Sequence, residues 1–433
     1  MPVRLATTDA NFDGAFASFL ASKREVSPDV EQSVRAIIAD VRQRGDAALL
    51  DYTRRFDQFD LSSRGVRMAE AEIREGARGC DVATLAALAM AKARIEAYHV
   101  RQLPKDEAFT DGLGAELGWR WSAIESVGLY VPGGLASYPS SLLMNAVPAK
   151  VAGVPRIAVA VPAPLGEVNP FVLAAANLVG ISEIYRIGGA QAVAAFAFGT
   201  QSVAPVAKVI GPGNAYVAAA KRQVFGTVGI DAIAGPSEVL IIADRENNPA
   251  WLAADLLAQA EHDTAAQAIL MTDDAAFAAV VEGEVDRQLA HLPRRDIAEA
   301  SWREFGAVII LATLEQAPAL ADRIAAEHVQ IVTRDPERLA HRIRNAGALF
   351  LGAHTPEVIG DYLAGSNHVL PTARSARFAS GLGVYDFMKR TSTLRLDAAA
   401  LRRLAAPAMV LARAEGLTAH ERSVALRLDP AAD

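Results

Sequence analysis

The stretch Glu238–Asp274, EVLIIADRENNPAWLAADLLAQAEHDTAAQAILMTDD, contains the pattern that decides the fold. It begins with EVLIIAD and ends with QAILMTDD, two short runs that are apolar at consecutive positions rather than at alternate ones. Strands of this kind are buried on both faces, as in a parallel sheet covered by helices. An Ala-rich segment with the composition of a helix lies between them. The stretch therefore predicts a strand–helix–strand unit.

The same alternation extends over much of the chain. Further apolar runs of this type are Arg156–Pro164, Glu183–Gly189, Ala207–Gly213, Ala307–Thr313, His328–Asp335 and Ala348–Thr355. Pro236 and Ser237 divide the series into two halves of about four strands each, with helical segments between the strands. We therefore expect an α/β protein with two Rossmann-like units, each a doubly wound and mostly parallel sheet, at 127–236 and 237–380.

The two ends of the chain are predicted to be mainly helical. Residues 1–126 form a helical N-terminal region with a short strand pair, which we expect to pack on the second α/β unit, and Asp29 is the expected cap of an early helix. Residues 381–433 form a helical C-terminal segment. In it Asp397 is the expected cap, and Pro407 should break the helical run.

Composition excludes several classes of protein. The hydrophobic fraction is 52%, but no span of about 20 apolar residues, the length that a bilayer requires, is present. The N-terminus lacks the basic-then-apolar order of a signal peptide. A net charge of -7 does not suit nucleic acid, because binding to phosphates needs a basic surface. We expect a cytoplasmic protein that binds neither membrane nor nucleic acid.

The chain has one cysteine, Cys80. A single cysteine excludes an internal disulfide and a thiolate metal cluster. It lies in EGARGCDVAT, a break between two helical segments of the N-terminal region. We therefore expect the thiol to be chemically idle.

The segment DLLAQAEHD places Gln259 and His262 three residues apart. At that helical spacing both side chains leave the same face, so an amide oxygen and an imidazole nitrogen can converge on one metal ion. The same residues also suit a solvated last turn, where the helix dipole favours a histidine. Both interpretations remain open on these residues alone.

Two glycine-containing turns follow strands and open helices. Gly188 and Gly189 precede Gln191, and the loop Gly211–Gly213 precedes Asn214, a good N-cap residue. Such turns let backbone amides approach a phosphate beyond the carboxyl ends of parallel strands. Neither is the G-x-G-x-x-G fingerprint, and glycines also serve simply to reverse the chain. The turns favour a nucleotide and a plain reversal about equally.

A carboxylate and an imidazole stand side by side at Glu327 and His328, where a helix meets a strand. These are the commonest proton acceptors near neutral pH, although a polar hinge facing solvent explains them equally well. Asp361 offers a hard oxygen ligand for a metal with nitrogen and oxygen donors. Nothing local explains His420, five residues after Glu415 in the C-terminal helix.

Taken together, these motifs resemble the histidinol dehydrogenase family over essentially the whole chain. The likeness is carried by GLYVPGG, SYPSSLLMNAVPAKVAGV, RIGGAQAVAA, GPGNAYVAAAKRQVFG, AGPSEVL, DLLAQAEHD, AEHVQI, GDYLAGSNHVLPT, FASGLGVYDFMKRTS and EGLTAHERSVALR. The resemblance implies a zinc enzyme that oxidises L-histidinol to L-histidine with two NAD, by way of L-histidinal, in the last steps of histidine biosynthesis.

The resemblance also implies roles for individual residues. The implied zinc ligands, for one Zn²⁺ per subunit, are Gln259, His262, Asp361 and His420. The residues implied to contact NAD, in the unit 127–236, are Tyr130, Gln191 and Asn214. Substrate is implied to contact Ser237, His328 and Glu415 together with the four metal ligands, and the proton acceptors are Glu327 and His328. The family's homodimer would deliver Glu415 and His420, in the segment 381–433, from the other subunit, so that each active site is shared.

The residues are also consistent with this chemistry on their own. Oxidation of an alcohol to an acid takes two hydride transfers, with water added to the aldehyde between them. Because Cys80 is badly placed to serve as a nucleophile, water must be activated by a carboxylate, which suits Glu327. His328 would remove the hydroxyl proton as each hydride leaves.

Two alternatives remain from the sequence. A related NAD- and zinc-dependent dehydrogenase could act on another small alcohol, such as a sulfonated diol. Alternatively, the chain could bind a metal or nucleotide without catalysis, although the pair Glu327 and His328 beside a full ligand set argues against that.

Overall fold

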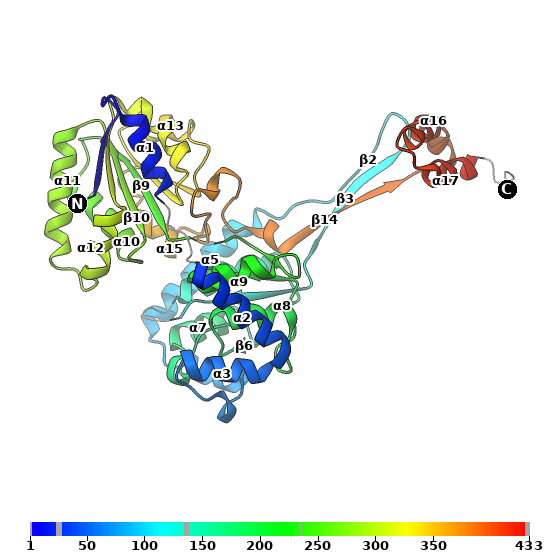
Figure 1. The fold of residues 1–433 in the computed structure, drawn as a ribbon, viewed down its shortest axis with the longest axis horizontal. Helices are drawn as coiled ribbons and strands as arrows, with labels where there is room; N and C mark the ends of the chain where they lie inside the picture. The colour runs from blue at the N-terminus through cyan, green and yellow to red at the C-terminus, as the bar shows by residue number, and fades with distance from the viewer. Residues whose placement is uncertain (1, 23–27, 134–137, 234, 429–433) are drawn as a thin grey trace.

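The computed structural model describes residues 2–22, 28–133, 138–233 and 235–428. Within them the chain forms two α/β units and a long arm (Figure 1). We call the units by their sheets, the five-stranded unit and the six-stranded unit. The predicted α/β class, with two doubly wound parallel sheets, is confirmed.

The five-stranded unit has the strand order β6-β5-β4-β7-β8, and every pair is parallel. Successive side chains of β5 enter opposite cores, with Ile157 and Val159 on one face and Ala158 and Ala160 on the other. This explains why its strands are apolar at consecutive positions. The strands are β4 (Ser126–Tyr130), β5 (Arg156–Ala160), β6 (Ile184–Tyr185), β7 (Lys208–Ile210) and β8 (Gly229–Ile230). The helices between them are α6 (Pro139–Val151), α7 (Pro170–Leu178), α8 (Gly189–Phe198) and α9 (Ala215–Val224), with a 3-10 turn η2 (Pro164–Gly166).

The six-stranded unit has the order β1-β11-β10-β9-β12-β13, again parallel throughout. Its strands are β1 (Val3–Ala6), β9 (Glu238–Ala243), β10 (Gln267–Thr272), β11 (Ala307–Ile310), β12 (His328–Val332) and β13 (Ala348–Leu351). Its helices are α1 (Phe12–Ala21), α10 (Pro249–Ala260), α11 (Ala275–Leu289), α12 (Arg295–Phe305), α13 (Ala317–Ile324), α14 (Pro336–Ala340) and α15 (Val358–Tyr362), with 3-10 turns η3 (Leu314–Gln316) and η4 (Ser375–Arg377). All the strands expected from 156 onward are present. The count of about four per half was too low, because β1, β4 and β8 also join the sheets.

The N-terminal region is divided between the two units. Strand β1 pairs with β11 in the six-stranded sheet. The helices that follow pack instead on the five-stranded unit, with α2 and α3 against α8 and with α4 and α5 against α7 and α6. These helices are α2 (Pro28–Arg44), α3 (Asp46–Phe56), α4 (Glu70–Ala77) and α5 (Val82–Val100), with a 3-10 turn η1 (Leu61–Ser63). The expectation that this whole region packs on the second unit was therefore wrong, because most of its apolar side chains complete the cores of the first.

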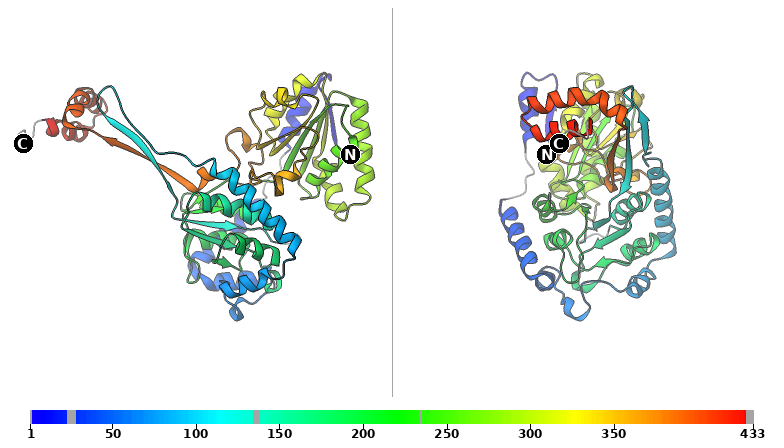
Figure 2. Two further views of the ribbon diagram at one scale, coloured as in Figure 1. Left: turned by 180° about the vertical axis from the view of Figure 1, so that it is seen from behind. Right: turned by 90° about the vertical axis from the view of Figure 1, so that its right-hand side faces the viewer.

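The arm is an antiparallel ribbon with two helices at its end. It projects away from both units, as Figure 1 and the left view of Figure 2 show. Its strands, in the order β14-β3-β2, are β2 (Glu107–Thr110), β3 (Glu116–Ala123) and β14 (Met388–Arg395). The helices are α16 (Ala398–Ala414) and α17 (Thr418–Leu428), and the 3-10 turn η5 (Val384–Phe387) joins the arm to the body. The expectation of a helical C-terminal segment at 381–433 holds for α16 and α17, but β14 is a strand within it.

Local signals at helix ends had mixed outcomes. Asn214 and Asp397 cap α9 and α16 through hydrogen bonds from backbone amides, as expected. Asp29 lies inside the first turn of α2 rather than before it. Pro407 lies inside α16 and does not end it. The helix continues past this proline and packs on α17.

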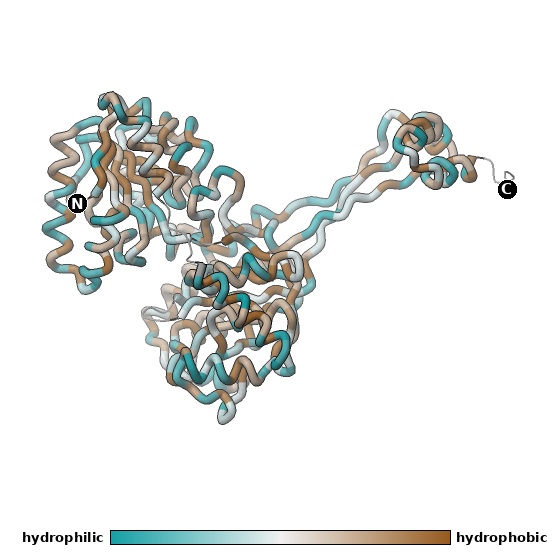
Figure 3. The backbone as a smooth tube through the Cα atoms, in the orientation of Figure 1, coloured by the Kyte–Doolittle hydropathy of each residue, from teal (hydrophilic) through white to brown (hydrophobic). Residues whose placement is uncertain are grey.

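Hydropathy follows this architecture. Apolar residues concentrate in the strands of the six-stranded unit, whereas the ribbon of the arm is mixed (Figure 3). Among the described residues, no helix combines the length and the apolar character needed to cross a bilayer.

The centre of the five-stranded sheet generates a stability prediction. A Cβ at Gly128, in β4, would lie 2.6 Å from the fully buried ring of Phe196. Gly128→Ala should therefore destabilise the protein by about 1–3 kcal/mol through overpacking. Gly112→Ala is the matched control, because a Cβ there would meet no other described atom within 4 Å apart from its chain neighbours. Urea unfolding of both variants measures the difference, and equal midpoints would contradict the proposed packing.

Candidate active site

The candidate site begins where β9 and β12 start side by side. Helix α13 ends at Ala325, which has a left-handed φ of 52°. The chain then passes through Glu327 directly into β12, whose first residue, His328, is in register with Val239 of β9. The expected helix-to-strand junction is confirmed. It places the Glu327 and His328 side chains beside Glu238, at the amino-terminal edge of the six-stranded sheet.

The backbone of Glu238 holds both of these side chains. Its N–H donates to Glu327 Oε2 at 3.0 Å, and its carbonyl lies 3.0 Å from His328 Nδ1. A carbonyl oxygen only accepts, so His328 Nδ1 must carry the proton. In the neutral ring Nε2 is then the nitrogen with the free lone pair.

Burial sets the charge state of the pair. Both side chains are almost fully buried, with 7% of Glu327 and 6% of His328 exposed. Burial raises the pKa of Glu327 well above its usual range and lowers the pKa of His328, because removal from water penalises the charged form of each. Near neutral pH the imidazole is therefore neutral and able to accept a proton at Nε2.

Carboxylates and imidazoles surround that nitrogen. His328 Nε2 lies 3.7 Å from Glu357 Oε2 and 3.9 Å from Asp361 Oδ1. The other Asp361 oxygen lies 4.0 Å from His262 Nε2, and Oδ1 lies 4.0 Å from His368 Nδ1. These separations are too long for hydrogen bonds. His328, Glu357 and Asp361 nevertheless offer one ligand atom each within 4.8 Å of one another, a spacing that a metal ion can bridge.

Two buried side chains beside this cluster have polar atoms without partners. Gln259 is 1% exposed, and neither its Oε1 nor its Nε2 has a hydrogen bond. Both carboxylate oxygens of Glu357 are likewise buried and without a hydrogen bond. Leaving such groups unsatisfied costs about 1–3 kcal/mol each. Orphaned buried donors and acceptors around an N/O cluster fit a divalent cation such as zinc, manganese or cobalt.

The end of α10 supplies the first pair of predicted ligands. Gln259 is in its last turn, and His262 follows in the next turn, where the His262 N–H donates to the Gln259 carbonyl at 3.2 Å. One helical turn earlier, Asp255 accepts from Gln330 Nε2 at 2.8 Å. Burial raises the pKa of Asp255 to about 6. The structure thus brings His262 within 4.0 Å of Asp361, and Gln259 lies three residues before His262 at the end of α10.

Sequence reasoning missed Glu357, Glu238 and the position of His368 within the site. Glu357 precedes Asp361 by four residues, a spacing that puts both on one face of α15, and this signal was available. Burial, followed by the charges of Asp361 and Asp255, raises the pKa of Glu357 to about 8. Glu238 acts through its backbone, so its residue type held no signal for this role. His368 lies in the loop after α15, and its Nδ1 lies 3.0 Å from the Asp361 carbonyl.

The structure does not bring Glu415 and His420 to this cluster within one chain. Glu415 caps the end of α16 and His420 is in the first turn of α17, and both are exposed. These helices are at the far end of the arm, away from α10 and α15 (Figure 1).

The predicted NAD contacts gather at the carboxyl ends of β4, β6 and β7. Tyr130 ends β4, and its hydroxyl oxygen accepts from the Gly189 N–H at 3.1 Å. Burial raises the pKa of Tyr130 to about 12, so the hydroxyl stays neutral. Gln191 is buried in the first turn of α8, and Asn214 Oδ1 accepts from two amides of α9 at 3.1 and 3.2 Å. Gly189 has a φ of 62°, and a Cβ there would lie 2.8 Å from Gln191 Oε1. The bare backbone at this turn fits the approach of a phosphate.

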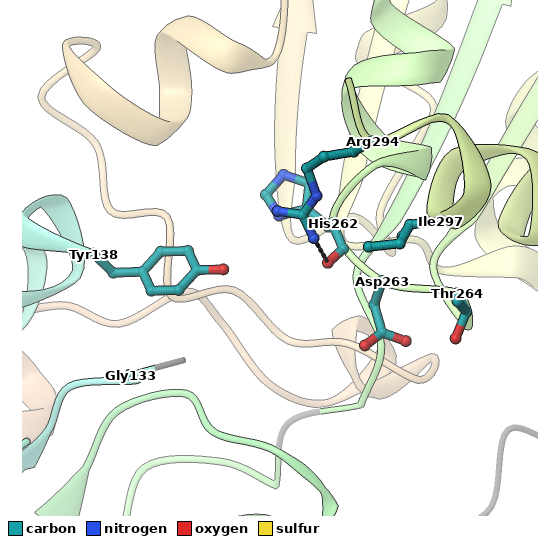
Figure 4. Close-up of a pocket in the computed structure, with 7 residues that line it drawn as sticks. All are labelled: Gly133, Tyr138, His262, Asp263, Thr264, Arg294 and Ile297. Atoms are coloured by element: carbon teal, nitrogen blue, oxygen red, sulfur yellow. Dashed lines mark hydrogen bonds between the residues drawn. The ribbon is translucent and has the colours of Figure 1, made fainter. Parts of the chain in front are cut away.

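A pocket lies between the two units, and His262 is the one predicted ligand among the described residues of its lining. It is lined by Gly133, Tyr138, His262, Asp263, Thr264, Arg294 and Ile297. Tyr138 extends from the five-stranded unit towards His262 of the six-stranded unit, and Arg294 Nη2 donates to the His262 carbonyl at 3.4 Å (Figure 4). The carboxyl edge of one sheet therefore faces the amino edge of the other. Ser237 immediately precedes β9 at this edge, and its carbonyl accepts from the Gln267 N–H at 2.9 Å.

Cys80 is not part of this arrangement. It lies buried between α4 and α5, and burial raises the pKa of its thiol, which disfavours the nucleophilic thiolate.

Comparisons with known proteins agree along the whole chain. A family model described as histidinol dehydrogenase matches residues 20–428. A histidinol dehydrogenase of Bradyrhizobium diazoefficiens is 66% identical over 429 residues, covering 99% of this chain and 100% of that protein. One of Brucella suis is 63% identical over the same coverage. The crystal structure of histidinol dehydrogenase from Elizabethkingia anophelis is 33% identical with a TM-score of 0.94, covering 99% of this chain and 98% of that one.

The buried carboxyl of Glu357 predicts a pH-dependent stability of the metal-free protein. Its pKa is about 8 in the folded chain against an ordinary 4.5, so between these values the folded state holds a proton that the unfolded state has lost. Stability should therefore fall as pH rises through this window, by about 2 kcal/mol from pH 6 to pH 8. Glu357→Gln cannot titrate and should lack this part of the loss.

Urea unfolding of chelator-treated wild type and variant at both pH values measures the effect. If the difference in unfolding free energy between the two proteins were the same at pH 6 and pH 8, the shifted pKa would be disproved.

Proposed function

The chain belongs to the histidinol dehydrogenase family, and we propose that it oxidises L-histidinol to L-histidine by way of L-histidinal, in the last steps of histidine biosynthesis. The observation that carries this proposal is the identity of 62–66% to histidinol dehydrogenases over 99% of the chain. The buried pair Glu327 and His328, beside a cluster of metal-ligating side chains, supplies the groups that such a reaction needs.

For the metal we propose one Zn²⁺ per subunit. Gln259, His262 and Asp361 of one chain would hold it together with His420 of the partner subunit, and the orphaned amide of Gln259 supports this set. A bound divalent ion would supply positive charge that favours ionised carboxylates, and it would bind the substrate's nitrogen atoms. The same N/O set is compatible with manganese or cobalt.

For the redox cofactor we propose NAD in the five-stranded unit, contacted by Tyr130, Gln191 and Asn214. When bound, NAD accepts a hydride in each of the two oxidations. Because the Asn214 side-chain oxygen already accepts the two capping amides, its amino group is the part that can donate to the dinucleotide. The neutral Tyr130 hydroxyl and the exposed amides of the Gly188–Gly189 turn suit a phosphate-bearing ligand.

His328 and Glu327 divide the proton transfers in this proposal. His328 Nε2 takes the hydroxyl proton of histidinol as the first hydride leaves, which yields the aldehyde. Glu327 takes a proton from the water that adds to the aldehyde carbon, while His328 returns its Nε2 proton to the carbonyl oxygen, so that the hydrate forms and Nε2 is free again. His328 then accepts a hydroxyl proton of the hydrate as the second hydride leaves, which yields the acid. The hydrogen bond from His328 Nδ1 to the Glu238 carbonyl keeps Nε2 available for both steps.

The charges around His328 favour histidinol over a sulfonated alcohol. The buried acidic groups Glu327, Glu357 and Asp361 face the reacting region. They suit a substrate that arrives as a cation and loses its ammonium proton on binding the metal, and they would repel a sulfonate. The proposed substrate contacts are Ser237, Gln259, His262, His328 and Asp361, with Glu415 and His420 of the partner subunit.

We propose that a second copy of the chain completes each site. Glu415 and His420 are exposed at the end of the arm, where Leu394 is 64%, Val410 55% and Leu411 63% exposed. Exposed apolar side chains on a projecting element are typical of an interface between subunits. An isologous dimer would place each arm over the partner's six-stranded unit.

The division of labour between the two bases is testable by single-turnover kinetics. Glu327→Gln should retain the first hydride transfer and lose most of the second, because only hydration of the aldehyde needs this carboxylate. His328→Asn should slow both transfers by about 10²–10⁴-fold. Stopped-flow NADH absorbance, with histidinol or histidinal as the substrate of the metal-loaded protein, measures each transfer.

Cys80→Ser is the control and should retain both transfers with two NADH formed per histidinol. Equal loss of both transfers in Glu327→Gln would refute the division, and a wild type that forms no NADH from histidinol would refute the proposed function.

Mixed dimers test whether the site is shared. Homodimers of His262→Asn and of His420→Asn should both be nearly inactive, because loss of a ligand should weaken metal binding by at least the roughly 10–100-fold that a second-shell change produces. A hybrid with one subunit of each kind has one site lacking both ligands and one intact site. Purified with two tags, it should recover about half of the wild-type activity per dimer. Background activity in the hybrid would mean that both ligands come from one chain.

A further inference from the structure

The five-stranded unit contains a buried ion pair that the proposed chemistry does not use. Lys221 Nζ, from α9, contacts Asp231 Oδ1, which follows β8, and only 2% and 4% of the two side chains are exposed. Removing both charges from water is costly unless further hydrogen bonds satisfy them. The partners that satisfy this pair therefore indicate what it is for.

Both members of the pair bind the backbone of one residue. Lys221 Nζ donates to the Gly211 carbonyl at 3.0 Å, and the Gly211 N–H donates to Asp231 Oδ2 at 2.9 Å. The main-chain donor and the main-chain acceptor of Gly211 are thus held by opposite charges from two different elements.

Gly211 is the first residue of the loop between β7 and α9. Its backbone φ of +121° is rarely adopted by residues other than glycine, and a Cβ there would lie 2.2 Å from the Tyr130 carbonyl oxygen. The loop is therefore pressed against the end of β4, and it leads through Gly213 to Asn214. A loop of this composition has high conformational freedom unless it is held.

We infer that Lys221 and Asp231 are positioning residues for the dinucleotide. They hold Gly211 against the end of β4, and in this way they fix the relative placement of Tyr130 and Asn214, the residues proposed to contact NAD. The pair carries no net charge, so it acts through geometry rather than by attracting the phosphates. This inference rests on the proposed use of NAD by the five-stranded unit.

The test measures NAD binding directly, by calorimetry on the full-length, metal-loaded protein. Lys221→Met with Asp231→Leu removes both charges together, so that neither is left buried alone. The dissociation constant for NAD should rise at least tenfold, whereas zinc content and the KM for histidinol should change less than twofold. An unchanged NAD affinity, or an equal loss of histidinol affinity, would overturn the inference.

Arg222→Met is the matched control. Arg222 is the next residue of α9, and it pairs with Glu31 of α2 at the surface without contacting the loop. Its loss should leave the NAD dissociation constant within twofold of wild type. A loss comparable to that of the double variant would mean that α9 as a whole, and not the clamp on Gly211, controls binding.

A second variant decides the matter if circular dichroism shows that the double variant does not fold. Asp231→Asn keeps an oxygen that can accept from the Gly211 N–H but weakens the contact with Lys221. It should raise the NAD dissociation constant at least threefold, and a change below twofold would overturn the inference. A wild type that oxidises histidinol while these variants bind NAD normally would refute only this inference. A wild type that binds NAD but leaves histidinol unchanged would refute only the proposed substrate.

Discussion

The two hydrogen bonds between the backbone of Glu238 and the side chains of Glu327 and His328 are the contact on which the site depends. They exist because β9 and β12 are adjacent parallel strands that start at the same edge. One bond orients the carboxyl group and the other selects the imidazole tautomer. Both main-chain groups are satisfied, so the pair can be buried without orphaned backbone. A loop position would not hold two titratable groups with this precision.

Removal of carboxylates from water gives the site its chemical character. Burial is the first cause of the raised pKa of Glu327, Glu357 and Asp361. Burial of these carboxyl groups without a metal carries a desolvation cost, which the proposed cation and a positively charged substrate would reduce. The buried side-chain amide of Gln259, which has no hydrogen bond, would also be stabilised by a bound cation. In the proposed function, metal binding and substrate binding would both depend on this buried cluster of carboxyl groups, which favours positive charge.

The arm, in contrast to the two units, has little packing against the rest of its own chain. Its ribbon and its two helices bury little against either unit, and they retain large exposed apolar residues. We therefore expect the arm to be stabilised by burial of these apolar side chains against another chain. This explains why residues so distant in sequence as Glu415 and Asp361 can be proposed for one site.

The sequence by itself determined the α/β class, most of the strands from 156 onward and the caps at Asn214 and Asp397, because these depend on local apolar pattern and local hydrogen bonds. It also singled out Gln259 with His262, whose spacing is local. Only the tertiary structure decided that β1 joins the second sheet while α2 to α5 cover the first, and that β14 pairs with β3, because such pairing depends on distant partners. The candidate active site likewise depends on distant partners. Ligands of parallel sheets commonly bind at the carboxyl ends of strands, and this rule leads to Tyr130 and the glycine turns. Glu238, Glu357 and His328 lie instead near the amino ends of β9 and β12. No sequence rule points there, because these residues meet only through the packing of α10, α15 and β12.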